Sequence, residues 1–137
     1  FMVAASRDPD GANLDRVQII KGWLNASGET EEKIFDVALS DGRSGNWFSG
    51  DIPAVGNTVD IENATYSNSI GAAELTAVWT DPEFDSEQRA FYYARVIQIP
   101  TPRWTTYDAK YFGAVIDPRA PKTIQDRAYS SPIWYTP

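Results

Sequence analysis

The fold of this chain is decided by the stretch Ala90-Phe-Tyr-Tyr-Ala-Arg-Val-Ile-Gln-Ile-Pro-Thr-Pro-Arg-Trp-Thr-Thr-Tyr-Asp108. Its first half lacks Gly, is rich in aromatic and β-branched residues, and stops at Pro100, which predicts a β-strand. Alternation places Tyr92, Ala94 and Val96 on one face of that strand and Phe91, Tyr93, Arg95, Ile97 and Ile99 on the other. Because both faces are largely apolar, we expect a central strand that the remaining strands cover.

Outward from this strand, short alternating segments are separated by turn residues. The pattern predicts further strands over residues 1–6, 14–24, 33–40, 57–63, 73–80 and 131–135. The apolar phase of the second strand slips near Ile19-Ile20, which predicts a bulge or burial on both faces, and Gly22 would let a neighbour approach closely. In the third strand Phe35, Val37 and Leu39 are expected to point inward, and Ala38 outward.

The other segments are expected to be short helices or loops. Residues 81–89 predict one helical turn or a compact loop, because Asp81 suits an N-cap and Pro82 the first helical position. Residues 123–129 are expected to form a second short helix, and residues 101–122 an irregular segment. Residues 41–55 predict a loop in which Trp47-Phe48 is anchored.

The fold class that follows is all-β, an antiparallel β-sandwich of about seven strands with one or two short helical turns. No domain boundary is visible, so residues 1–137 are expected to form a single domain. An immunoglobulin-like version is favoured by the central strand. In it, the hydroxyl of Tyr92 turns back to the preceding corner, Ala94 takes the place of the core cysteine, and Trp23 is the core tryptophan.

Composition excludes several classes of function. The net charge of −7 disfavours nucleic acid and anionic membrane surfaces, which need clustered Lys and Arg. The 137 residues contain no Cys and no His, so a self-contained zinc enzyme or Ser-His-Asp hydrolase is excluded. No apolar run approaches the ~20 residues of a membrane span, so no membrane insertion is expected. We predict no catalytic residue and no cofactor in this chain.

Two acidic features are candidate sites. The segment Asp8-Pro-Asp-Gly-Ala-Asn-Leu-Asp15 offers four oxygen side chains and could hold Ca²⁺. It lacks the spacing of an EF-hand, and Asp and Asn also form plain turns, so a structural turn is the main expectation. Carboxylate pairs such as Glu74 with Asp81, or Glu83 with Asp85, could serve acid/base chemistry on a glycoside, but nothing distinguishes them from solvated surface acids.

The cluster Pro102-Arg-Trp-Thr-Thr-Tyr-Asp108 has the composition of an interface hot spot. We predict that Arg103, Trp104, Tyr107 and Asp108 contact a partner. The segment could equally fold its own Trp104 onto the strands with Arg103 stacked on it, or form an aromatic platform for a sugar.

Several ordered motifs carry a family resemblance. They run over residues 7–23, 55–60, 70–75, 89–108 and 130–137, the last of which reads Ser-Ser-Pro-Ile-Trp-Tyr-Thr-Pro. The chain resembles, over nearly its whole length, the C-terminal region of the bacterial family named domain of unknown function 3604. That family is itself similar to PHP-type metal-dependent hydrolases, whose His- and Asp-rich catalytic domain lies N-terminal.

The resemblance implies an accessory domain, and none of the family's metal ligands can be carried over to a chain without His. The implied partners are the N-terminal catalytic domain of a larger protein, of which this chain is a C-terminal fragment, or further copies in a homo-oligomer. The implied location is the periplasm or cell envelope. The alternative is a free-standing module that binds a carbohydrate or a cell-surface partner through exposed aromatic residues. An enzyme in its own right would need a carboxylate pair in a cleft.

Overall fold

The computed structural model describes residues 1–45 and 52–137, and these form antiparallel β-sheets with one short helix. The predicted anchoring of Trp47-Phe48 lies outside the described residues. The elements are β1 (Met2–Ser6), β2 (Leu14–Leu24), β3 (Thr30–Leu39), β4 (Glu74–Val78), β5 (Ala90–Gln98), β6 (Thr101–Pro102), α1 (Trp104–Phe112), β7 (Thr123–Ile124), β8 (Arg127–Tyr129) and β9 (Ile133–Tyr135). In this part of the chain no helix has the length and apolar character needed to cross a bilayer.

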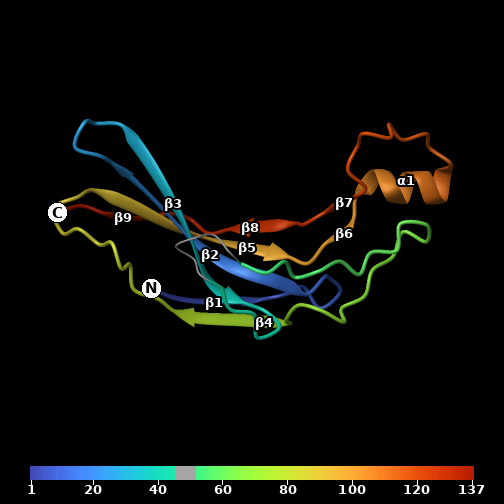
Figure 1. Cartoon of the computed structure of the whole chain (residues 1–137), viewed down its shortest axis with the longest axis horizontal. Helices are drawn as coiled ribbons and strands as arrows, with labels where there is room; N and C mark the ends of the chain where they lie inside the picture. Colours follow the sequence, from blue (N-terminus) through green and yellow to red (C-terminus); the bar gives the residue numbers. More distant parts are fainter. Residues whose placement is uncertain (46–51) are drawn as a thin grey trace.

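The main sheet has five strands and is built around β5, as the sequence predicts. Its order is β3-β2-β5-β8, and β9 pairs with the same edge of β5 as β8, nearer the start of β5. Between β8 and β9, Ser130 continues the pairing because its N–H donates to the carbonyl of Ala94 and its Oγ accepts from the N–H of Ala94. The central strand therefore has partners along both edges (Figure 1).

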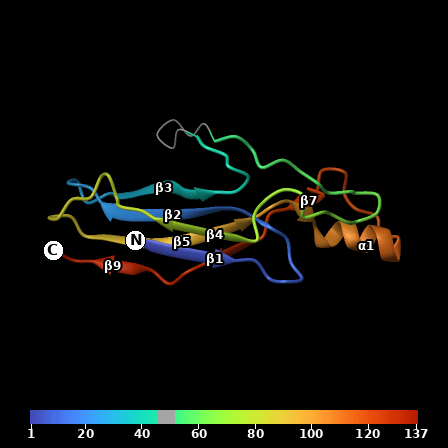
Figure 2. The ribbon, with the colours of Figure 1, turned by 90° about the horizontal axis from the view of Figure 1, so that it is seen from below.

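A second, two-stranded sheet of β1 and β4 lies against one face of the main sheet (Figures 1 and 2). We call the face that it covers the inner face and the opposite one the outer face. The core between the sheets forms two clusters, one around Leu14, Val17 and Leu75, the other around Ile19, Ala90 and Tyr92. Leu75 of β4 and Trp79, just after it, contribute to these clusters.

The irregularity predicted in β2 exists but begins earlier than the sequence indicates. The pairing with β3 shifts between Val17 and Gln18, and the pairing with β5 shifts between Leu14 and Arg16. As a result Leu14 joins the same core cluster as Val17, and Ala38, predicted to point outward, pairs with Val17 and packs inward. Beyond the bulge, Ile20 on the outer face is completely buried, so β2 is buried on both faces there.

Three segment predictions are wrong. Residues 57–63 form no strand; they contain a turn closed by the bridge between Asp60 and Thr65, in which Asp60 accepts from Asn63. Residues 123–129 are not helical, because β7 pairs with β6 and β8 with the open edge of β5. Residues 101–122 are not irregular throughout, since they contain β6 and α1. Residues 81–89 form a compact loop of turns, one of the two predicted forms.

Candidate functional site

The helix α1 carries three of the four residues predicted to contact a partner. Trp104, Tyr107 and Asp108 lie on α1, and Arg103 is the extended residue just before it. Their spacing of three and four residues places the three side chains on one helical face, and Tyr111 extends that face by another turn. The predicted loop is therefore a helix, which brings the predicted residues together and adds Tyr111 to them.

The sequence contains a signal for this helix that the strand-based interpretation missed. Gly113 adopts the left-handed conformation, with φ 65° and ψ 24°, and its N–H donates to the carbonyl of Ala109. The bond from Gly113 to Ala109 is the single 5→1 bond of a left-handed C-terminal cap, and the N–H of Ala114 donates in addition to the carbonyl of Asp108. A glycine following Lys110 in the last turn is the usual mark of a helix C-terminus.

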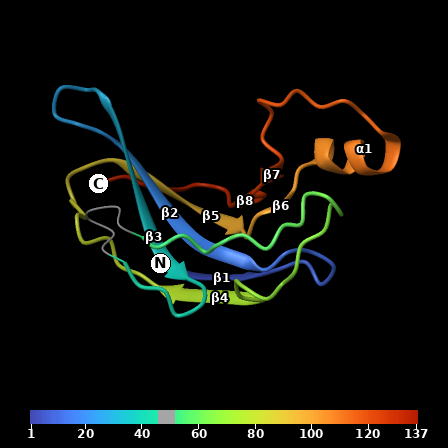
Figure 3. The ribbon, with the colours of Figure 1, turned by 45° about the vertical axis from the view of Figure 1, so that its right-hand side comes forward.

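One side of α1 is fixed to the chain around it. Thr105 and Thr106 are buried, and Oγ1 of Thr106 donates to the carbonyl of Lys122 at 2.7 Å. The N–H of Arg103 donates to the same carbonyl, beside the short β6–β7 pair. These contacts hold α1 in a lobe that projects beyond the end of the sheets (Figures 1 and 3).

The other side of α1 is open to solvent and apolar. The exposed fractions are 64% for Trp104, 64% for Tyr111, 82% for Phe112 and 100% for Val115. We call these four residues, with Arg103, Tyr107 and Asp108, the α1 surface. The guanidinium of Arg103 lies 6.0 Å from the ring centre of Trp104, so the stacked pair exists, but Trp104 is not folded onto the strands. Burial, followed by the neighbouring Tyr66 and Tyr111, raises the pKa of Tyr107.

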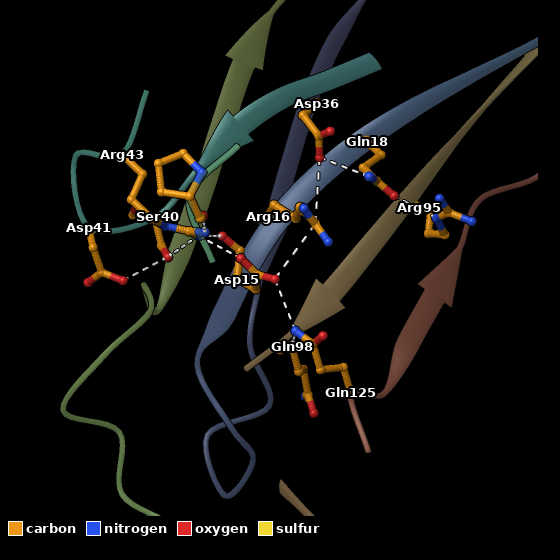
Figure 4. Close-up of polar contacts among 11 residues, drawn as sticks. Asp15, Arg16, Gln18, Asp36, Ser40, Asp41, Arg43, Arg95, Gln98 and Gln125 are labelled. Atoms are coloured by element: carbon orange, nitrogen blue, oxygen red, sulfur yellow. Dashed lines mark hydrogen bonds and ion pairs between the residues drawn. The ribbon is translucent and has the colours of Figure 1, made fainter. Parts of the chain in front are cut away.

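A network of polar side chains crosses the strands at the α1 end of the main sheet (Figure 4). Asp15 is its buried centre. Its Oδ1 accepts from Nη2 of Arg43 at 2.6 Å, and its Oδ2 accepts from Nε2 of Gln125 at 3.0 Å. Arg43 also donates to the carbonyls of Asp15, Ser40 and Pro53, so it fastens the segment after β3 to β2.

The network continues onto the outer face through Arg16, whose Nε lies 3.6 Å from both Asp15 and Asp36. Asp36 accepts from Gln18 at 2.8 Å, and Gln18 accepts from Nε of Arg95 at 2.7 Å. One strand each, β3, β2 and β5, supplies these three side chains. Asp15 and Asp36 each face guanidinium groups, so the arrangement clamps strands together and places neither as a free acid or base.

A second buried cluster lies on the inner face, at the end away from α1. Oδ2 of Asp81 accepts from Nζ of Lys21 at 2.7 Å and from the hydroxyl of Tyr92 at 2.8 Å. Burial alone raises the pKa of Asp81, but the bonds from Lys21, Glu83 N–H and Tyr92 outweigh it and hold that pKa below its ordinary value. Burial and the same carboxylate raise the pKa of Tyr92. The cluster fixes the corner before β5 to the core.

Comparison with known proteins identifies the family. The model of the family described as "Protein of unknown function (DUF3604)" matches residues 1–137. The chain belongs to the DUF3604 family. No curated protein and no solved structure matches it. The family resemblance carried by the sequence motifs is confirmed.

The candidate Ca²⁺ loop of this DUF3604 chain holds an arginine instead. Nη1 of Arg7 donates to the carbonyls of Asp8, Pro9 and Gly11. The side chain of Asp8 accepts from the N–H of Asp10, which is an ordinary Asx turn. The side chain of Asn13 instead donates to the carbonyls of Asn68 and Ile70, and its N–H donates to the side chain of Asn68. The carboxylate of Asp15 accepts from Arg43. The four oxygen side chains therefore do not converge.

One member of each carboxylate pair named from the sequence forms an ion pair with a lysine in the DUF3604 chain. Asp81 is committed to Lys21, and Glu83 forms an ion pair with Lys33. Glu74 lies on β4, whose antiparallel partner is β1. Within residues 1–45 and 52–137, no group of three or more His, Cys, Asp or Glu side chains is placed to hold a metal ion.

Proposed function

We propose that this chain is a non-catalytic accessory domain that packs on a metal-dependent catalytic domain in a larger protein. The support is membership of the DUF3604 family, together with the α1 surface. Location in the periplasm or cell envelope is part of the proposal and rests on the family resemblance alone.

The observation that carries the proposal is the exposure of the α1 surface on an anchored helix. Single exposed apolar residues are common, but large aromatic residues gathered on one protruding element mark interaction sites. Trp, Tyr and Arg are the residues that most often dominate binding energy at interfaces. Trp104, Tyr111 and Phe112 supply the apolar centre, and Arg103 and Asp108 supply a polar rim.

We further propose that the two sheets represent an immunoglobulin-like β-sandwich. Two features support this. The hydroxyl of Tyr92 turns back to the connection before β5, as a tyrosine at the corner of such domains does, but its acceptor is the carboxylate of Asp81 and not the backbone. Trp23 packs against the cluster of Ile19 and Tyr92, where a core tryptophan is expected. A rigid frame of this kind suits a domain that presents α1 to a partner.

The test uses the full-length protein with Trp104→Ala and Phe112→Ala. We expect faster proteolytic separation of the two domains and reduced hydrolytic activity. Trp134→Ala is the matched control, because Trp134 is 72% exposed but lies at the opposite end of the main sheet. Unchanged domain association and activity in both α1 variants would refute the proposal. Loss of an oligomer with intact domain association would instead assign the α1 surface to contact between copies.

A second candidate function, a module that binds a carbohydrate or a cell-surface partner, is favoured by a separate observation. Aromatic side chains from β5, β8 and β9 form a row on the outer face of the main sheet. This row does not include any residue of the α1 surface.

A further inference from the structure

The outer face carries four aromatic rings in successive contact. The strand register shows which residues lie side by side across this face. Gly22, Phe91 and Trp134 are direct cross-strand neighbours. Two residues further along β5, Tyr93 lies beside Ile20, and two residues beyond that, Arg95 lies between Gln18 and Tyr129. Ring contacts link Trp134 to Phe91, Phe91 to Tyr93 and Tyr93 to Tyr129. We call these four residues the aromatic row. Its two middle rings lie along β5, and the end members Tyr129 on β8 and Trp134 on β9 are 57% and 72% exposed.

The two middle rings lie flat on the sheet. A Cβ atom added to Gly22 would meet three atoms at the tip of the Phe91 ring at 2.3, 2.5 and 3.0 Å, so this ring lies across the glycine. The close approach predicted at Gly22 is thereby confirmed. The plane of Tyr93 differs by only 10° from that of Phe91, and Ile20, its cross-strand neighbour, is fully buried.

The spacing shows that these rings lie side by side. Their centres are 6.3 Å apart, close to the advance of two residues along a strand, about 6.6 Å, and far beyond face-to-face contact. Phe91 and Tyr93 are each partly exposed. The end rings are tilted against this pair, Trp134 by 48° and Tyr129 by 43°. The result is a flat aromatic floor with a raised ring at each end.

Polar groups lie at both ends of the floor. Beside Trp134 a groove of about 550 Å³ is lined by the polar residues Thr30, Glu31, Glu32 and Arg89, together with apolar ones such as Leu24, Phe91 and Tyr135. Beside Tyr129 lie Arg95 and its partner Gln18, with Asp36 next to them. Acids and arginines occur together at each end, so neither end has a surplus of positive charge to hold an anionic ligand.

We propose that the aromatic row binds a neutral polysaccharide chain. The aliphatic C–H groups on the flat face of a pyranose ring carry partial positive charge and are attracted to the negative face of an aromatic ring. Two coplanar rings offer that surface to successive sugar units, and the polar ends bind their hydroxyl groups. A protein hot spot is instead a side chain that fills a pocket in its partner, which flat rings cannot do. The inference rests on the second candidate function, and it is independent of docking through the α1 surface.

The experiment follows the migration of the 137-residue chain in native gels that contain hydroxyethyl cellulose, mixed-linkage β-glucan, xylan or galactomannan, with polygalacturonate as the anionic comparison. Tryptophan fluorescence titrations with the matching hexasaccharides give the affinity. We expect retardation by at least one neutral polymer and none by polygalacturonate. Tyr93→Ala should weaken binding about tenfold or more, because half of the floor is lost, whereas Tyr93→Phe should bind as the parent does.

Trp104→Ala is the matched control and should leave polysaccharide binding unchanged. If Tyr93→Ala does not fold, as circular dichroism would show, Trp134→Ala replaces it, because that side chain is exposed and its loss spares the core. Absence of retardation by every neutral polymer would overturn the inference, and so would equal binding by the parent and Tyr93→Ala or, where it replaces that variant, Trp134→Ala. Self-association in sedimentation velocity that Tyr93→Ala abolishes would also overturn it and make the aromatic row a contact between copies. If the α1 variants left domain association and activity of the full-length protein unchanged, the proposed docking role would fail, but the expected polysaccharide binding would be unaffected.

Discussion

Replacing Asp81 by Asn tests the buried cluster that holds the corner before β5. Asp81 accepts three hydrogen bonds, from Nζ of Lys21, the hydroxyl of Tyr92 and the N–H of Glu83. Nζ of Lys21 also donates to the carbonyl of Glu83 at 2.7 Å. The side chains of Lys21 and Asp81 are only 3% and 4% exposed, so solvent screens this ion pair little.

The expected cost follows from leaving one charge without its partner. In Asp81→Asn the ammonium of Lys21 stays buried and faces a neutral amide, which typically lowers the free energy of unfolding by about 3–5 kcal/mol. The total free energy of unfolding of a domain is only about 5–15 kcal/mol. Removing both charges, in Lys21→Met with Asp81→Leu, should recover a large part of that loss, because no unpaired charge remains.

Urea unfolding followed by tryptophan fluorescence provides the measurement. With a slope of about 2 kcal/mol/M, Asp81→Asn should lower the unfolding midpoint by about 2 M at unchanged slope. A drop of less than about 0.5 M would show that the pair is solvated and the reasoning wrong. So would a double variant that is no more stable than Asp81→Asn alone.

Three further predictions concern other contacts. Gly22→Ala should destabilise the chain by about 1–3 kcal/mol, and by much less when Phe91→Ala has removed the ring that the new methyl meets, as a double-mutant cycle in urea would show. Arg43→Lys should lower the free energy of unfolding by about 1–3 kcal/mol, because an ammonium cannot reach the several acceptors that the guanidinium binds. The control Arg119→Lys, in an exposed pair with Asp117, should leave the melting temperature unchanged. Because the folded state holds the proton of Tyr92 more tightly than the unfolded state, stability should fall as the pH rises above about 10, and Tyr92→Phe should flatten that decline in a series of urea titrations.

Much of the strand framework follows from the sequence because alternation is a local property. The second strand was predicted over the residues that form β2, and the central role of β5 follows from its two apolar faces. The sequence places the bulge near Ile19-Ile20, later than the observed shift after Val17. The reason is that the alternation of apolar residues shows a bulge only once the residues beyond it have changed face. The sequence pattern does not predict α1 because the two Thr residues of its first turn favour strands, while the tertiary contact of Thr106 with Lys122 and the Gly113 cap favour the helix.

The candidate surfaces divide in the same way. Arg103, Trp104, Tyr107 and Asp108 could be selected from residue type alone, and helical spacing then places the last three on one face. The aromatic row could not be predicted, because Tyr129 and Trp134 follow Phe91 and Tyr93 by more than thirty residues in the sequence. The wrong helix at 123–129 has the same origin, since the open edge of β5 decides that Arg127–Tyr129 pairs as β8.

Residue order alone was enough to predict the β class of the fold, the identity of the central strand and the absence of histidine and cysteine chemistry. Those properties depend on residue type and on the short periods of local backbone geometry. The folded chain was needed to learn which ring lies flat across Gly22, which oxygens Arg7 and Arg43 bind, and which face of α1 stays open. Such contacts depend on strand register and bulges, because a shift of one residue moves every side chain of a strand to the opposite face.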